Sequence, residues 1–241
     1  MTTAPRVFSY WEGPMPPWIG LCLDTMRRNI PGVEILTRQQ WRDMFDYRDV
    51  SASCLANQTP NLRSDFIRAW LLKTYGGIWI DADCIVFRDV RPIFDHLETA
   101  DLVAYRVGQP SPQLCSALIA AKAGSPIISD YYRACCRRLR RCGRLPRLAL
   151  GPRMLRRTIE SRTDRVHCLP SEMVHPVHWR RAWRLRKPGQ IDIPDDAYTC
   201  MLTHRALGPM RQWSADRLRE SDTVIGELFR RALGLSDIHQ I

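Results

Sequence analysis

The stretch NLRSDFIRAWLLKTYGGIWIDADCIVF, residues 61–87, decides the fold of this chain. Its first half is mostly apolar and predicts a buried helix. Gly76 is placed to end that helix in the left-handed conformation, and Gly77 allows a tight turn into the next element. The following Ile78-Trp79-Ile80 is β-branched and aromatic and predicts a buried strand. A helix, a double-glycine stop and a strand are therefore expected in immediate succession.

Charged side chains lie on the predicted helix and at the end of the strand. At 100° per residue, Ser64, Asp65 and Arg68 share one side of the helix, and a buried Asp and Arg need a partner or a task. Strand periodicity places Asp81 and Asp83 on the same face. Two such carboxylates repel each other unless a cation or a proton lies between them. Mg²⁺ or Mn²⁺ takes oxygen ligands and recruits phosphate oxygens, so it would relieve this repulsion.

Each of these residues also has a simpler interpretation. Asp65 and Arg68 are spaced as an i,i+3 ion pair, which contributes only a few tenths of a kcal/mol on an exposed helix surface. One of Asp81 and Asp83 can cap a turn while the other is solvated. A D-x-D pair alone is common, but here S-D-x-x-R, an apolar helix and Y-G-G-I-W-I precede it.

The stretch SDFIRAWLLKTYGGIWIDAD, residues 64–83, resembles the signature of the DXD-containing sugar transferases, a group similar to glycosyltransferase family 32. This group includes yeast-type α-mannosyltransferases, the glucosylating domains of large bacterial toxins, and bacterial capsular polysaccharide synthesis proteins. The opening FSYWEGPMPPW, residues 8–18, is most similar to the capsular branch. The resemblance is strong over about residues 6–95.

The resemblance implies an α/β fold of GT-A type, with a Rossmann-like, mostly parallel sheet flanked by helices. It also implies a nucleotide-sugar donor whose diphosphate is bridged by a divalent metal, Mn²⁺ or Mg²⁺, to Asp81 and Asp83. Asp65 and Arg68 would contact the donor sugar, and Arg68 would also reach a phosphate oxygen. Ser64 would touch the ribose or the sugar. Relatives retain the anomeric configuration, so no dedicated general base is assigned.

The resemblance implies roles for further residues. Trp11 would stack on the nucleobase, although a core tryptophan beside Trp18 is the alternative. His204 would complete the metal shell, against the alternative of a surface histidine, and Arg205 would supplement Arg68. On the acceptor side, Ser116 stands where many relatives carry an Asn, and Gly151-Pro152 matches a family motif, although alone it indicates only a helix start.

The remaining pattern alternates strands and helices, as in a mostly parallel α/β sheet whose ligands gather at the carboxyl ends of the strands. Strands are expected at Arg6–Tyr10, Val33–Leu36, Cys84–Phe87, Asp101–Tyr105, Val166–Leu169 and Tyr198–Thr203. Helices are expected at Ile19–Arg28, from a capping box at Thr37 to Phe45, at Ser116–Lys122, Pro126–Cys142, Gly151–Arg162 and Ser221–Leu233.

A length of 241 residues predicts one domain. Within it, about residues 1–110 would form the nucleotide-sugar-binding half and about residues 111–241 the acceptor-side half with Arg-rich helices. No run of 18 apolar residues and no secretory signal is found, and the nine cysteines are odd in number and irregularly spaced. We therefore expect a reduced, cytoplasmic protein.

The net charge of +11 is concentrated in one segment, since residues 131–165 hold twelve arginines against Glu160 and Asp164. Three interpretations are open: a solvated helix face, a surface that contacts anionic lipid at the inner face of the cell membrane, or a nucleic-acid patch. No nucleic-acid-binding motif accompanies the last one. The residues concerned are Arg137, Arg138, Arg140, Arg141 and Arg144.

These observations predict a metal-dependent glycosyltransferase that moves a hexose from a nucleotide sugar to a glycan or lipid-linked glycan acceptor, in capsular or other surface polysaccharide synthesis. Asp81, Asp83 and Arg68 would carry the reaction. The first alternative is a catalytically inactive, Arg-rich adaptor that binds membrane or nucleic acid on the same fold. A metal-dependent phosphohydrolase is a second alternative, but it would need more converging carboxylates or histidines than the sequence offers.

Overall fold

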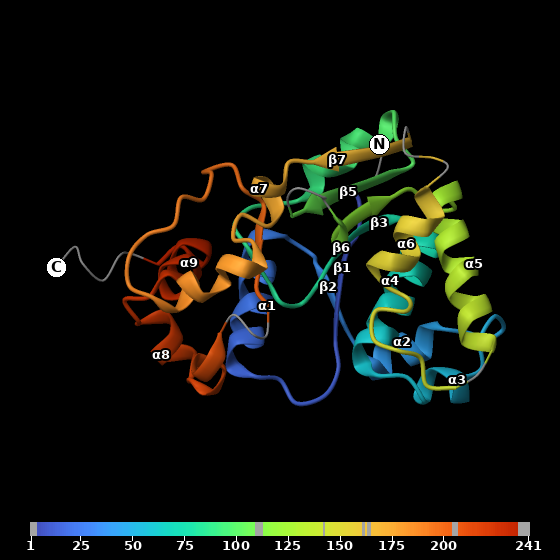
Figure 1. The fold of residues 1–241 in the computed structure, drawn as a ribbon, viewed down its shortest axis with the longest axis horizontal. Coiled ribbons are helices and arrows are strands. Elements are labelled where there is room, and N and C mark those ends of the chain that lie inside the picture. The colour runs from blue at the N-terminus through green and yellow to red at the C-terminus, as the bar shows by residue number, and fades with distance from the viewer. Residues whose placement is uncertain are drawn as a thin grey trace.

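The computed structural model describes residues 4–108, 113–141, 143–160, 162, 165–203 and 207–235 (Figure 1). A six-stranded sheet forms its centre, in the order β2-β1-β3-β6-β5-β7. Only β6 runs against the other strands of this sheet, because β1 is parallel to β2 and β3, β5 is parallel to β7, and β6 is antiparallel to both β3 and β5. The strands are β1 Val7–Trp11, β2 Glu34–Thr37, β3 Gly77–Ile80, β5 Leu102–Val107, β6 Gln113–Ala121 and β7 Val166–Leu169.

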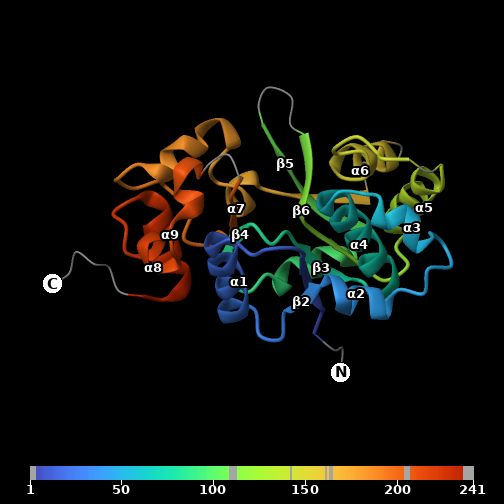
Figure 2. The same cartoon turned by 90° about the horizontal axis from the view of Figure 1, so that it is seen from below.

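Helices cover both faces of the sheet (Figures 1 and 2). On one face lie α1 and α9 with a two-stranded antiparallel ribbon of β4 and β8, and on the other lie α2, α4, α5 and α6. The elements outside the main sheet are α1 Pro17–Asn29, α2 Arg38–Met44, α3 Ala52–Ala56, α4 Pro60–Tyr75, β4 Cys84–Val86, η1 Arg91–Glu98, α5 Pro126–Arg140, α6 Pro152–Ile159, α7 Ser171–Val174, η3 Trp179–Arg186, β8 Thr199–Met201, η4 Gly208–Gln212, α8 Ala215–Arg219 and α9 Val224–Leu233.

Most of the expected elements are confirmed to within a few residues, including the capping box at Thr37, whose side chain and that of Gln40 bond each other's backbone N–H. The expectation for residues 116–122 was wrong. Ser116 to Ala121 belong to β6, a central strand between β3 and β5, and not to a helix. The alanines favour a helix locally, but burial on both faces of the sheet outweighs that preference.

The double glycine between α4 and β3 is required by close backbone packing. Gly76 has φ 65° but ψ −169°, so its backbone is not in the left-handed helical conformation that was expected. A side-chain carbon at Gly76 would lie 2.5 Å from the Ala123 backbone nitrogen, and one at Gly77 would lie 2.3 Å from the Arg6 carbonyl oxygen. Both glycines therefore allow β3 to enter the sheet directly after α4.

All eight cysteines in the described part of the chain carry free thiols, in agreement with the irregular spacing. None of the helices in the described residues is both long and apolar enough to cross a bilayer.

We predict that Gly77→Ala destabilises the fold much more than Gly32→Ala. Both glycines have positive φ, 107° and 72°, but only at Gly77 does a methyl group meet backbone, whereas the space around Gly32 is open. Gly32→Ala should cost about 1–2 kcal/mol, the usual penalty of the left-handed region. Gly77→Ala should cost clearly more in urea unfolding, and equal losses would contradict the close-packing argument.

Candidate active site

Arg68 lies at the centre of a buried polar cluster at the carboxyl edge of the sheet. Its side chain comes from α4 and is only 2% exposed. Nη1 donates to Asp65 Oδ1 at 3.0 Å and to Ser116 Oγ on β6 at 2.5 Å. Nη2 donates to Asp81 Oδ1, directly after β3, at 2.5 Å. One guanidinium group thus holds together a helix, a strand and the loop that follows another strand.

The charges of this cluster depend on one another. Burial raises the pKa of Asp65 to about 6, although the neighbouring Arg68 opposes the shift. Burial by itself would lower the pKa of Arg68. The charges of Asp81 and Asp65 outweigh this effect and raise the pKa of Arg68 above its usual value. Arg68 therefore stays charged, and its charge favours the ionised form of the buried Asp65.

Asp81 and Asp83 lie in a turn rather than on a continuing strand, which corrects the expectation from strand periodicity. β3 ends at Ile80, and the Cys84 N–H donates to the Asp81 carbonyl oxygen at 3.2 Å. Asp81 Oδ1 also accepts from Trp79 Nε1 at 2.6 Å. Burial, together with the Asp81 charge, raises the pKa of Asp83 to about 8. The ionised form of Asp83 is therefore disfavoured first by burial and then by the charge of Asp81.

This donor set fits a divalent cation. Two aspartates follow β3 at the sheet edge, and the raised pKa of the buried Asp83 means that added positive charge would favour its ionised form. Carboxylate oxygens are the ligands that Mg²⁺ and Mn²⁺ take, usually with phosphate oxygens and water. Among the described residues no group of three or more His, Cys, Asp or Glu side chains forms a metal site by itself. His204 and Arg205, which were expected to contribute, lie outside the described residues.

The structure places Trp11 and Ser64 near this cluster without bonding them to it. Trp11 ends β1 at the same carboxyl edge, is half-buried and packs against the core. Its buried Nε1 has no hydrogen-bond partner within the part of the chain that is described. Ser64 is half-buried, precedes Asp65 on α4, and takes no part in the hydrogen bonds around Arg68. Both roles stay predictions.

Gly151 contributes to the site in a way that the sequence analysis missed. A side-chain carbon at Gly151 would lie 2.7 Å from Asp65 Oδ2, so only glycine leaves room for that carboxyl group. The adjacent Leu150 carbonyl oxygen accepts from Tyr131 Oη of α5 at 2.6 Å. The Gly-Pro pair was noted as a helix start, but nothing in the sequence indicates that it faces a residue 86 positions earlier.

A second buried ion pair fixes the loop after Trp11. Arg63 Nε donates to Glu12 Oε1 at 2.8 Å, and both side chains are almost fully buried. The Arg63 guanidinium also donates to the Gln58 carbonyl oxygen. This pair ties the end of β1 to the start of α4, so it determines where Trp11 lies relative to Asp65.

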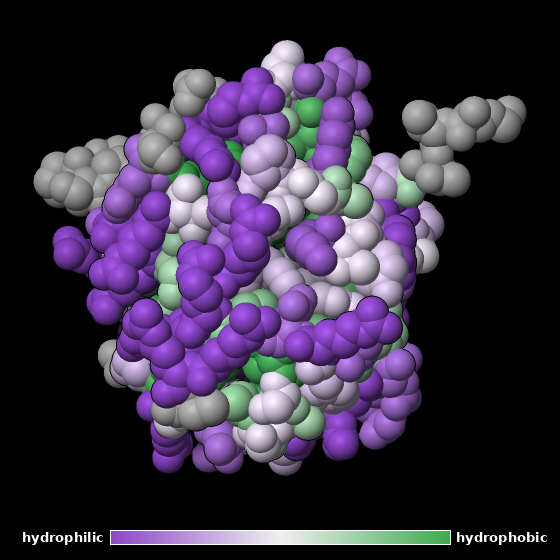
Figure 3. All heavy atoms as spheres, turned by 90° about the vertical axis from the view of Figure 1, so that its right-hand side faces the viewer, coloured by the Kyte–Doolittle hydropathy of each residue, from purple (hydrophilic) through white to green (hydrophobic). Residues whose placement is uncertain are grey.

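The five arginines of the basic segment lie apart from the Arg68 cluster, at and just after the end of α5. All five are exposed: Arg137, Arg138, Arg140, Arg141 and Arg144. Figure 3 presents the side of the molecule on which α5 lies, and this side is largely hydrophilic. Arg140 Nε donates to the Asp49 carbonyl oxygen at 2.7 Å. Contact of this segment with anionic membrane stays a prediction.

We predict that Arg68→Met destabilises the protein by about 3–5 kcal/mol at pH 7, since removing one partner leaves buried charges uncompensated. Asp65→Asn should cost much less, because it removes a charge that burial already disfavours. Urea unfolding of both variants measures the difference. Losses of similar size would show that Arg68 is not the group that stabilises the cluster.

Comparison of the wild type with Asp65→Asn also gives a pH prediction. The pKa of Asp65 is raised from 3.8 to about 6, so the native carboxyl group binds a proton that the unfolded chain has lost. Stability contributed by Asp65 is therefore fully present below about pH 4 and falls as the pH rises to about 6. Relative to Asp65→Asn, the wild type should lose stability over this window, and parallel curves would contradict the assignment.

Comparison with known proteins identifies relatives of this chain. A family model described as capsular polysaccharide synthesis protein matches residues 3–137. The O-glycosyltransferase braB of Annulohypoxylon truncatum is 30% identical over 154 residues, which are 54% of this chain and 37% of that protein. The chain therefore spans little more than a third of the length of this curated relative.

One solved structure is similar enough to show the fold. The galactosyltransferase LgtC, in complex with donor and acceptor sugar analogs, has a TM-score of 0.50 and 11% identity over 98% of both chains. The PaToxG glycosyltransferase has a TM-score of 0.44 and 17% identity over 97% of this chain and 79% of its own. The α/β architecture is the GT-A fold that the sequence led us to expect. The family model matches more than half of the length of this chain. This chain therefore belongs to the family of capsular polysaccharide synthesis proteins.

Proposed function

We propose that this protein is a metal-dependent glycosyltransferase that moves a hexose from a nucleotide-sugar donor to a glycan acceptor in the synthesis of a capsular or other surface polysaccharide. The observation that carries the proposal is the buried cluster in which Arg68 joins Asp65, Ser116 and Asp81 at the carboxyl edge of a GT-A sheet. Family membership and the named glycosyltransferase relative support the same activity.

In this proposal Asp81 and Asp83 would hold the divalent metal at the carboxyl end of β3. When bound, the metal would neutralise the charge that develops on the departing diphosphate. Asp81 Oδ1 is already bonded to Arg68 and Trp79, so the carboxylate is fixed in orientation before any ligand arrives. Such preorganisation lowers the cost of arranging the site in the transition state.

Arg68 acts in this proposal as a positioning residue for the two aspartates beside it. Its terminal nitrogens donate three hydrogen bonds, to Asp65, Ser116 and Asp81. These use three of the five guanidinium N–H groups, and the buried Nε has no hydrogen-bond partner among the described residues. Asp65, held above Gly151, would accept hydrogen bonds from hydroxyl groups of the donor sugar, with Ser64 beside it. Trp11 would provide a flat apolar surface for the nucleobase.

A rival interpretation is an inactive adaptor on the same fold. An adaptor does not require buried charged groups at the sheet edge. A transferase requires them, because they bind and orient the donor. Hydrolysis or transfer of a nucleotide sugar in the presence of metal therefore distinguishes the two.

A panel of nucleotide sugars is first screened for the donor that the wild type turns over. We expect Asp81→Asn and Asp83→Asn to abolish turnover of that donor. Both variants should also lose the increase in melting temperature that the donor gives with Mn²⁺. The reason is that each variant removes one charged oxygen ligand. Asp95→Asn is the matched control, because Asp95 is an exposed aspartate on η1, and it should behave as wild type. Wild-type rates after EDTA treatment would refute metal dependence.

We expect Trp11→Ala to raise the donor KM by about 5- to 150-fold with little change in kcat, since aromatic stacking on a base contributes about 1–3 kcal/mol. Trp11→Phe should recover much of the loss, because a flat ring remains. An unchanged KM with a lowered melting temperature would assign Trp11 to the core instead.

A further inference from the structure

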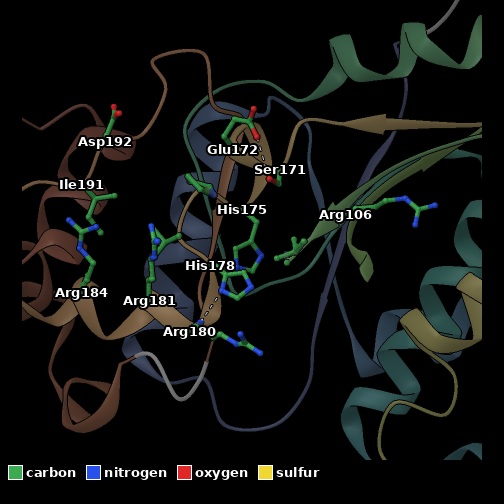
Figure 4. A pocket seen from close by; sticks show the side chains of 14 residues that line it. Arg106, Ser171, Glu172, His175, His178, Arg180, Arg181, Arg184, Ile191 and Asp192 are labelled. Atoms are coloured by element: carbon green, nitrogen blue, oxygen red, sulfur yellow. Dashed lines mark hydrogen bonds between the residues drawn. The ribbon is translucent and has the colours of Figure 1, made fainter. Parts of the chain in front are cut away.

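A cavity lies at the end of β5, and none of the residues that line it belongs to the Arg68 cluster or has a role in the proposed donor site. It has a volume of about 730 Å³ and is bounded by the last residues of β5, by α7 and by η3 (Figure 4). This volume is in the range of sites that bind small molecules. The cavity therefore has room for a sugar with its substituents.

The charged groups around this cavity are mostly positive. Arg106, Arg180, Arg181 and Arg184 line it, against the carboxylates Glu172 and Asp192. Within the described residues, the ion pairs closer than 4.0 Å include none of these four arginines. In Figure 4 Glu172 and Asp192 lie at the upper side of the cavity, and Arg180 and Arg181 lie below and beside the imidazoles. Arg184 and Arg106 lie farther out, at opposite sides of the view, so Arg180 and Arg181 are the two arginines beside the imidazoles.

A buried histidine faces the same space. His175 is 5% exposed and lines the cavity, yet neither of its ring nitrogens has a hydrogen-bond partner among the described residues. Burial, reinforced by the nearby His178, lowers the pKa of His175 to about 4, so the ring is neutral and offers one donor and one acceptor. Buried polar groups are normally paired, and an unpaired imidazole beside a cavity indicates a missing ligand or water.

The cavity and the Arg68 cluster lie at the same edge of the sheet. β3 and β5 run in the same direction, because β6 is antiparallel to both. Asp81, directly after β3, and Arg106, near the end of β5, therefore both lie toward the carboxyl edge of the sheet. Tyr105 lies beside the cavity and contacts β8: its ring centroid lies 6.3 Å from that of His175, and its hydroxyl donates to Met201 Sδ at 3.8 Å. The next residue, Leu202, donates its N–H to the Asp83 carbonyl oxygen at 2.8 Å.

We propose that this cavity binds the glycan acceptor through an anionic substituent, a carboxylate or a phosphate, held by Arg180 and Arg181. The inference rests on the proposed transferase function and names the substrate class of its acceptor side. Guanidinium groups bind both oxyanions through paired, charge-assisted hydrogen bonds. Glu172 and Asp192 would accept hydrogen bonds from sugar hydroxyls, and His175 would serve as a neutral donor or acceptor.

An exposed aromatic ring at the side of the cavity supports a sugar as the ligand. Trp179 is 45% exposed, and its ring lies 3.8 Å from the ring of His178, measured between centroids. It contacts the position of Gly108, where a side-chain carbon would lie 3.4 Å from the indole. An apolar surface beside donors and acceptors matches the mixed character of a saccharide.

The test is a calorimetric titration of the full chain with glucuronate, glucose 1-phosphate and glucose, without donor or metal. We expect both anionic sugars, or one of them, to bind at least tenfold more tightly than glucose and to weaken as salt rises. The two arms distinguish a carboxylate from a phosphate as the preferred substituent. Arg180→Gln/Arg181→Gln should weaken anionic binding about tenfold or more at an unchanged melting temperature, because both side chains are exposed.

Arg137→Gln/Arg138→Gln is the matched control, since it removes the same charge from exposed positions on α5. It should leave the affinities within twofold of wild type. Equal affinity for glucose, undiminished binding in Arg180→Gln/Arg181→Gln, or an equal loss in the control would each overturn the proposal. Because the titration contains neither donor nor metal, its outcome does not depend on whether the chain turns over a nucleotide sugar.

Discussion

A buried guanidinium group needs hydrogen-bond partners, and Arg68 obtains its partners from segments that are far apart in the sequence. Asp65 lies one turn earlier on the same helix, but Asp81 follows β3 and Ser116 lies on β6. Satisfying one charge therefore fixes the position of α4 against two neighbouring strands. The same requirement places Asp81 and Asp83 at the sheet edge, so the packing of the core and the geometry of the proposed site depend on one interaction.

Much of this arrangement could be predicted from local patterns. The apolar helix, the glycine pair and the β-branched strand are adjacent in the sequence, and each constrains the next through backbone geometry. Asp65, Arg68 and Asp81 were singled out because charge on buried elements needs an explanation. Their convergence at one cluster agrees with that expectation, although which ligands they contact stays a proposal.

The remaining parts depend on contacts that no local pattern encodes. Ser116 was assigned to a helix because its neighbours favour one, yet insertion between β3 and β5 makes this segment a strand. That strand brings its hydroxyl to Arg68, 48 positions away. Gly151 faces Asp65 only because Tyr131 and the chain before α6 pack over α4. The Asp81–Asp83 spacing indicates a strand pattern, whereas the chain turns there because β4 leaves the main sheet to pair with β8.

The reversed direction of β6 has a consequence for how such a fold can diversify. Because β6 is antiparallel to β3 and β5, its beginning rather than its end lies beside Asp81. At the carboxyl edge β5 therefore ends and β6 begins, while the far end of β6 pairs with β3 and β5 within the sheet. Lengthening a surface connection costs little free energy, since closure entropy grows only slowly with length. Insertions between β5 and β6 would thus reshape the environment of an acceptor while leaving the buried charges that organise the donor side unchanged.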